Sequence, residues 1–320
     1  MSRIRVQSAS RKEIDPQGLH TRSIARMPRW THIWLRSPLS ISGLAIILFF
    51  ILVAVLAPAL APPMLAEDPF RIPRSGYAAV PQPPSPGHLF GTTEGQYDIF
   101  YGVVWGARSA FFVGIVVTGL TVVFGIIVGA VSAFIGGWVD EITQRIVEIV
   151  FAFPFLLAAL TLATVLLPKL QNGLVVGMVA LIAFGWPTYA RIMRGDVLAI
   201  KERDYILAAR ATGVPTWRIL LRHILPNSIT SVLVVAWLDL GTNVLAFASL
   251  SFLGLGAGAG YADWGQLISL ARNWIPNLTA YWYTLVFPGG ALMLFVLGWN
   301  LIGDALRDAL DPRNRVQRVA

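Results

Sequence analysis

The chain has 320 residues, of which 56% are hydrophobic and 13% charged, whereas an average soluble domain holds about 45–50% apolar and about 25% charged residues. Its apolar residues are concentrated in charge-free blocks of 30, 31 and 31 residues, at positions 37–66, 109–139 and 273–303. Each block exceeds the ~20 residues that a helix needs to cross a bilayer. The composition therefore excludes an ordinary soluble domain and predicts an all-α polytopic membrane protein.

Several kinds of chemistry are also excluded. The chain has no cysteine, so it has neither disulfides nor thiolate metal sites, and its 4 histidines lie far apart. It contains no Gly-Lys dipeptide and no G-x-S-x-G motif, so a phosphate-binding P-loop and a serine-hydrolase elbow are absent. We expect no metal site, no catalytic residue and no cofactor, and any ATP hydrolysis must occur in another chain. The formal net charge of +8 is concentrated beside the apolar blocks, which indicates membrane topology and not a nucleic-acid partner.

The apolar pattern predicts six spanning helices, at residues 39–56, 110–134, 149–167, 173–189, 228–252 and 282–302. Positive charge marks the cytoplasmic side of a membrane protein. Residues 1–37 contain eight Lys or Arg and two acids, and residues 191–222 contain seven and three. Both stretches are therefore expected in the cytoplasm, and an even number of spans places both termini there.

These assignments divide the chain into five parts. The expected parts are a basic cytoplasmic tail (1–37), a first transmembrane helix (38–60), an extracytoplasmic Pro-rich segment (61–107), a core of five transmembrane helices (108–303) that includes a cytoplasmic loop (195–225), and a cytoplasmic C-terminal tail (304–320).

The cytoplasmic loop carries the most unusual local pattern. Residues 202–212 favour a helix, and Gly213 followed by Pro215 is a helix stop signal. A second short helix can begin at Pro215 and end or bend near Pro226. Two short helices joined at a glycine would form a protruding elbow, which either docks another protein or lies on anionic lipid. The pattern alone favours neither.

Motifs in and around this loop resemble those of permease subunits of ABC importers, in particular the C-type permeases of the dipeptide, oligopeptide and nickel group. The loop resembles the family's EAA loop, and the resemblance covers residues 39–313. The motifs that carry it are LAAxxxG at 207–213, ILP at 224–226, GTT at 91–93, GARS at 106–109, GGWVDE at 136–141, AFP at 152–154, ASLSFLGLG at 248–256, WG at 264–265 and GDxLRDxLDPR at 303–313.

The resemblance implies a type I ABC importer permease with six transmembrane helices in a prokaryotic plasma (inner) membrane. It implies a heterodimer with a sibling permease, two cytoplasmic ABC ATPases that bind the ATP, and an extracytoplasmic solute-binding protein. It also implies that the loop couples the permease to the ATPases. The expected coupling residues are Tyr205, Leu207, Ala208, Ala209, Arg210, Ala211, Gly213 and Pro215.

Two positions depart from the family pattern. The family usually has glutamate where this chain has Leu207, and it tends to have glutamate where this chain has Phe247. An ion pair between the first carboxylate and an ATPase is therefore missing or replaced. A polar role of the second position in the translocation path is in doubt.

Asp239 lies near the middle of the fifth predicted span. An acid at the bilayer centre costs at least about 2.5 kcal/mol, so it is a functional candidate by default. It could face a wet cavity and contact substrate, or it could be protonated or hydrogen-bonded to a neighbouring helix. The expected residues of a translocation path are Asp239, Phe247 and Ser249.

The chain is thus expected to be a permease subunit for peptides or related small solutes, with the individual substrate left open. The alternative is a self-sufficient secondary transporter or channel. That class typically shows several intramembrane charges or broken helices in repeated halves, and this chain has one mid-span acid and no convincing repeat. A membrane enzyme would need a nucleophile or metal constellation, and the sequence contains neither.

Overall fold

The computed structural model describes residues 38–64, 67–76 and 78–310, and in that part of the chain every regular element is a helix. A π-helical turn, Leu220–Ile224, joins α8 to α9, and a 3₁₀ turn, Arg272–Asn277, joins α10 to α11. The α-helices are α2 (Pro38–Leu60), α3 (Ile99–Ile135), α4 (Gly137–Ala152), α5 (Phe155–Leu170), α6 (Gly173–Lys201), α7 (Asp204–Ala211), α8 (Thr216–Ile219), α9 (Leu225–Phe252), α10 (Trp264–Ala271) and α11 (Leu278–Leu310).

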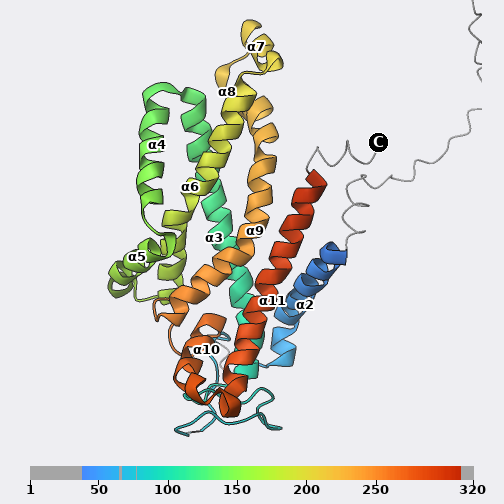
Figure 1. Ribbon diagram of the computed structural model, residues 1–320, viewed down its shortest axis with the longest axis vertical. Coiled ribbons are helices and arrows are strands. Elements are labelled where there is room, and N and C mark those ends of the chain that lie inside the picture. Colours follow the sequence, from blue (N-terminus) through green and yellow to red (C-terminus); the bar gives the residue numbers. More distant parts are fainter. Residues whose placement is uncertain (1–37, 65–66, 77, 311–320) are drawn as a thin grey trace, which may run out of the picture.

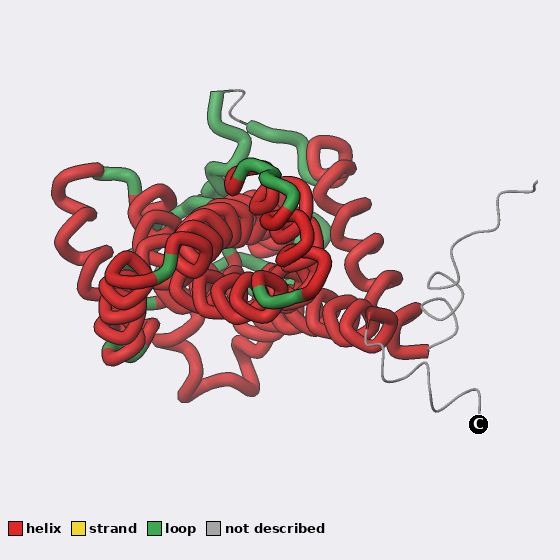
Figure 2. Tube along the Cα trace, turned by 90° about the horizontal axis from the view of Figure 1, so that it is seen from above, coloured by secondary structure: helices red, strands yellow, loops and turns green. Residues whose placement is uncertain are grey.

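The long helices form one elongated bundle (Figure 1). Helices α3, α6 and α9 lie at its centre and pack on one another, α4 and α5 lie on one flank, and α2 packs on α11 on the other. Seen from above, α2 and α11 project from one side of the bundle (Figure 2). The short helix α7 lies at one end of the long axis, and the segment between α2 and α3 lies at the other end.

Among the described residues, five helical stretches are long and apolar enough to cross a membrane, and α4 with α5, bent by 89°, makes a sixth when the pair is counted as one span. The six-span all-α architecture is therefore confirmed, but the prediction of one continuous helix at 149–167 is wrong. Phe153 has φ −92° and ψ 135° between the two helices. A proline disfavours the α conformation in the residue before it, so Pro154 forces this break.

The fifth span also differs from expectation, near Pro226. Residues Thr216–Phe252 form one apolar stretch with no break at Pro226, because the Leu225 N–H donates five residues back to the Leu220 carbonyl in the π turn. That turn changes the hydrogen-bond register directly before Pro226, which has no N–H to donate. In α11 the residue with non-helical angles is Tyr281, with φ −115° and ψ 25°, and the helix also contains Pro288.

Helices α3 and α6 approach closely because glycines face the contact. A Cβ atom on Gly125 would collide with Tyr189, and one on Gly129 would collide with the backbone of Ala190. The G-x-x-x-G pair of α3 therefore packs within this chain, as small residues in membrane helices commonly do. This contact holds α6, and hence the loop that follows it, against the centre of the bundle.

The Pro-rich segment between α2 and α3 covers one end of the bundle. It ends earlier than predicted, because α3 begins at Ile99 with Asp98 as its N-cap. The Trp105 indole N–H donates to the Ala61 carbonyl at 2.9 Å, and the Tyr101 hydroxyl donates to the Pro69 carbonyl at 2.7 Å. The predicted tail 1–37 lies outside the described residues, as do residues 311–320 of the predicted tail 304–320, whereas residues 304–310 continue α11 as helix.

Candidate functional site

The first candidate site is the elbow, which comprises α7, the turn after it and α8. It projects from the end of the bundle opposite the Pro-rich segment (Figure 1). Three isoleucines anchor it: Ile206, Ile219 and Ile224 are 0%, 1% and 0% exposed and belong to a core cluster with residues of α3 and α6. Because apolar packing resists deformation, the elbow is fixed to the central helices as a rigid projection.

The turn of the elbow requires glycine. Gly213 has φ +80°, and a Cβ placed there would meet nothing within 4 Å. The Gly213 N–H donates to the Arg210 carbonyl at 3.0 Å, and the Val214 N–H donates to the Ala209 carbonyl at 3.1 Å. This pair of bonds is the Schellman ending of a helix, in which the residue in the left-handed conformation is usually glycine. The local pattern Gly-x-Pro therefore predicted the turn correctly.

The elbow and the π turn after it expose large apolar side chains among charged ones such as Asp204, Arg210 and Arg218. Tyr205, Leu207, Trp217 and Leu221 are 44%, 50%, 60% and 55% exposed. Among the other expected coupling residues, Ala208, Arg210, Ala211, Gly213 and Pro215 are exposed, and Ala209 is half-buried. Leu207 thus presents an isobutyl group where the family pattern has a carboxylate. Exposed large apolar side chains on a rigid projection are typical of a protein contact.

The second candidate site surrounds Asp239 in α9. The hydroxyl of Tyr189, in α6, donates a hydrogen bond of 2.6 Å to Oδ2 of Asp239. A cavity of about 200 Å³ opens beside this pair. Its apolar wall comprises Val150, Phe151, Phe153, Phe155, Phe184 and Gly185, and its polar wall comprises Thr121, Thr188, Tyr189, Asp239, Thr242 and Asn243.

The break between α4 and α5 forms part of this cavity. Phe151, Phe153 and Phe155 flank Pro154 and bring three aromatic rings to the wall. The carboxylate and the rings thus come from different helices. The cavity exists because the third span is bent, a feature that the predicted straight helix did not include.

The other two residues expected on a translocation path lie elsewhere. Phe247 is 2% exposed, and its ring packs where a Cβ on Gly177 would stand, in the core between α9 and α6. Ser249 lines a different, mostly apolar hollow near α10, and its hydroxyl donates to the Leu245 carbonyl of its own helix at 2.9 Å. The structure therefore does not bring Phe247 and Ser249 to the Asp239 cavity.

The comparisons with known proteins agree on one family. The sequence profile for "binding-protein-dependent transport system inner membrane component" matches residues 121–316. The chain is 40% identical over 278 residues to the dipeptide transport system permease protein DppC of Alkalihalophilus pseudofirmus, covering 87% of each chain. The chain belongs to this family. It is also 39% identical to the oligopeptide transport system permease protein OppC of Bacillus subtilis, covering 89% of this permease and 90% of that one.

A more distant relative and a solved structure extend the comparison. The permease is 34% identical to the glutathione transport system permease protein GsiD of Pectobacterium atrosepticum, covering 89% of this chain and 91% of that one. A chain of the MetNI methionine ABC transporter, solved in inward-facing conformations, matches with a TM-score of 0.51 at 19% identity. That match covers 64% of this chain and 96% of the solved one, and it shows a shared fold.

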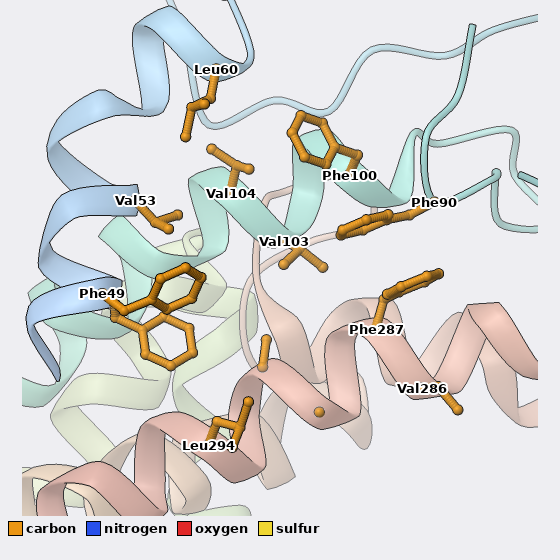
Figure 3. A pocket seen from close by; sticks show the side chains of 13 residues that line it. Phe49, Val53, Leu60, Phe90, Phe100, Val103, Val104, Val286, Phe287 and Leu294 are labelled. Atoms are coloured by element: carbon orange, nitrogen blue, oxygen red, sulfur yellow. The ribbon is translucent and has the colours of Figure 1, made fainter. Parts of the chain in front are cut away.

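A second and larger cavity of the permease differs in character from the Asp239 cavity. It has a volume of about 480 Å³ and lies between α2, α3 and α11, with Phe90 closing one side (Figure 3). Phe90 and Phe287 stack there with ring centroids 3.9 Å apart. All of its lining side chains are apolar, so it has no polar group with which to orient a solute.

Sequence reasoning missed the ion pair between Asp140 and Arg194. The two side chains lie on α4 and α6 and are joined by hydrogen bonds of 2.8 and 2.7 Å. Asp140 falls inside the family motif at 136–141, which was a usable signal, but no local pattern identified Arg194 as its partner. Within the described part of the permease, no group of three or more His, Asp or Glu side chains is arranged to hold a metal ion.

Proposed function

We propose that this permease is the membrane-spanning subunit of an ATP-driven importer of peptides or related small solutes. An extracytoplasmic binding protein would deliver the solute, and a sibling permease would complete the translocation pathway as a heterodimer. The observation that carries the proposal is the elbow: a rigid, apolar-tipped projection at one end of a bundle whose relatives are named as dipeptide and oligopeptide permeases.

Two ATPase subunits would supply the energy. The sequence contains no P-loop, so we expect ATP to bind to these partners and not to the permease. We place their contact at the outer face of the elbow, formed by Tyr205, Leu207, Ala208, Ala209, Arg210, Ala211, Gly213 and Pro215. Because Leu207 replaces the usual glutamate, this contact would depend on apolar packing more than on an ion pair.

The elbow is placed to transmit motion. Its buried isoleucines pack on residues of α3 and α6, and α8 continues through the π turn into α9. Movement of a docked ATPase would therefore tilt α6 and α9, which form the wall around Asp239. Alternation between an inward-open and an outward-open cavity would follow from that tilt.

Docking is favoured over lipid binding by the direction of the elbow. A helix that rests on lipid lies in the plane of the interface, beside the bundle. The elbow instead extends along the long axis, beyond the ends of the neighbouring helices (Figure 1). With the elbow in the cytoplasm, the Pro-rich segment faces outward, where the binding protein would dock, and both termini are cytoplasmic.

The cysteine-free chain permits a direct test of docking. A single cysteine at Ala208 or Ala211, both exposed, should form a cross-link with a cysteine in the surface cleft of the ATPase, and the yield should change with nucleotide. A cysteine at Thr161, exposed on α5 far from the elbow, is the matched control and should not cross-link. Ready labelling of Ala208→Cys by a small thiol reagent in the full complex, with no cross-link in any nucleotide state, would overturn the docking proposal.

A further inference from the structure

Asp239 has no counter-ion among the residues that the structure describes. It lies 14 residues from the start and 13 residues from the end of α9, or about 20 Å of helix from either end. The three ion pairs found among the described residues do not include it. The guanidinium of Arg191 lies instead over the ring of Phe151, 4.2 Å from its centroid.

Only one of its two carboxylate oxygens is satisfied. Oδ2 accepts the Tyr189 hydroxyl, and none of the hydrogen bonds of the described residues reaches Oδ1. Oδ1 is also absent from the buried polar atoms that have no partner, so it is accessible from the cavity that Asp239 lines. A carboxylate with one oxygen held by a hydroxyl and the other open is set to receive a donor from the cavity.

The remaining wall favours a cation. Phe153, Phe155 and Phe184 line the cavity, while the ring of Phe151 already carries Arg191. The faces of aromatic rings attract ammonium groups, an attraction that strengthens away from water. The threonine and asparagine side chains on the polar wall can accept further hydrogen bonds from an N–H. An acid, aromatic rings and neutral acceptors together match a primary ammonium group better than an anion or a neutral solute.

We propose that Asp239, held in place by Tyr189, binds the ammonium group of the transported solute as it passes the middle of the membrane. The ligand class is a primary amine such as the free N-terminus of a peptide. This inference rests on the proposed function for its role in transport, although the cation site itself can be tested without any partner subunit.

A purely structural role of Asp239 predicts different effects of substitutions. If Asp239 only accepts the Tyr189 hydrogen bond, Asp239→Asn keeps an acceptor and should behave like Tyr189→Phe, which removes the donor. If the negative charge matters, Asp239→Asn should be far more harmful than Tyr189→Phe, and Asp239→Glu should recover part of the loss.

The first test measures cation preference in the cavity. Thr242 is exposed, lines the cavity, and bonds only the Leu238 carbonyl of its own helix, so Thr242→Cys is a mild reporter in a chain without cysteine. In lipid, a cationic ethylammonium methanethiosulfonate should modify it at least about fivefold faster than the anionic ethylsulfonate, after correction for their rates with a free thiol. Asp239→Asn should abolish that preference.

Thr161→Cys is the matched control. Thr161 is likewise an exposed threonine bonded to its own helix, at the Leu157 carbonyl, and it lines a neighbouring cavity with no acid. It should show no cation preference with either residue at 239. An equal preference at Thr161 and Thr242, a preference that survives Asp239→Asn, or labelling of Thr161→Cys alone would each overturn the proposal.

A competition measurement on Thr242→Cys avoids any change at Asp239. Millimolar Ala-Ala should slow modification by the cationic reagent at least about twofold, whereas N-acetyl-Ala-Ala, which lacks the ammonium group, should not. Equal slowing by the two peptides, or by neither, would count against ammonium recognition even if Asp239 variants fail to assemble.

The transport measurement separates this inference from the proposed function. In the complete importer, Asp239→Asn should lower ATP-driven uptake of Ala-Ala about tenfold or more, while the loaded binding protein still stimulates ATP hydrolysis. Normal uptake by Asp239→Asn would overturn the inference and leave the importer intact. Absence of ATP-driven uptake by the unaltered complex would overturn the proposed function, whatever the labelling results at Thr242.

Discussion

The guanidinium of Arg194 holds the carboxylate of Asp140 through two hydrogen bonds, from Nε at 2.8 Å and from Nη2 at 2.7 Å. Arg194 lies near the elbow end of α6, and Asp140 lies in the first turn of α4. About two turns further along α6, the Lys201 ammonium donates to the carbonyls of Ala133 and Phe134 at 3.2 and 3.0 Å. Helix α6 thus ties down both the end of α3 and the start of α4.

A double-mutant cycle should detect the ion pair between Asp140 and Arg194. The two side chains are 32% and 14% exposed, and hydrogen bonds to charged groups contribute about 1.5–3 kcal/mol each when partly shielded. Arg194→Gln and Asp140→Asn should each lower the free energy of unfolding in detergent by about 2 kcal/mol, and the double variant should lose much less than the sum. Additive losses in thermal unfolding would show that the pair does not interact.

Glycine substitutions on α3 should separate close packing from helix propensity. Gly129→Ala places a Cβ against the backbone of Ala190, whereas Gly119 of the same helix has nothing within 4 Å. We expect Gly129→Ala to lower the melting temperature, and Gly119→Ala to leave it unchanged or raise it slightly, because alanine favours a helix over glycine by up to about 1 kcal/mol. Equal effects at both positions would contradict the α3–α6 contact.

The backbone conformation of Gly213 should control the coupling between the loaded binding protein and ATP hydrolysis. Gly213 has φ +80°, and a Cβ atom added there would meet nothing within 4 Å. The penalty for a side chain at this position is therefore conformational and does not come from crowding by neighbours. Gly213→Val should abolish the stimulation of ATP hydrolysis by the loaded binding protein, whereas Gly213→Asn should retain part of it, because asparagine tolerates the left-handed conformation. Gly195→Ala, at an open helical position, is the control. Full stimulation with valine at 213 would show that the turn plays no part in coupling.

The free energy of unfolding should depend on pH through Asp263, near the Pro-rich segment. Its carboxylate caps α10 by accepting the Gln266 N–H at 3.0 Å. Burial raises the pKa of this carboxyl above its ordinary value of 3.8, although hydrogen bonds to it act in the opposite direction. The unfolded chain therefore releases this proton first, and the free energy of unfolding should fall as the pH rises from 3.8 towards the folded pKa.

Asp263→Asn provides the comparison for that measurement, because asparagine also caps helices but does not titrate in this range. Thermal unfolding of the two proteins in detergent between pH 4 and pH 7 should give curves that converge at the acidic end and diverge above it, with the unaltered protein losing relative stability. Parallel curves would show that the carboxyl has the same pKa in both states.

Local patterns predicted the parts of the site that depend on neighbours in the sequence. The turn at Gly213 followed from a glycine and a proline two residues apart, and the elbow helices followed from the residues on either side. The sequence also contained the signal for the bend of the third span, in Phe153-Pro154, because the constraint of proline acts on the preceding residue. Only its magnitude, 89° between α4 and α5, required the structure.

The sequence by itself determined that this is a helical membrane protein of a transport family, because long charge-free runs are stable only in lipid and because the motifs lie in the family's order. The tertiary structure alone decided which side chains meet: Tyr189 and Asp239 are 50 residues apart, and Asp140 and Arg194 are 54 residues apart. In water, amphipathic patterning shows which helix face is buried, but in lipid both faces are apolar. Phe49 is 58% exposed and its neighbour Phe50 is 3% exposed, a difference that only the packing of α2 on α3 and α11 creates.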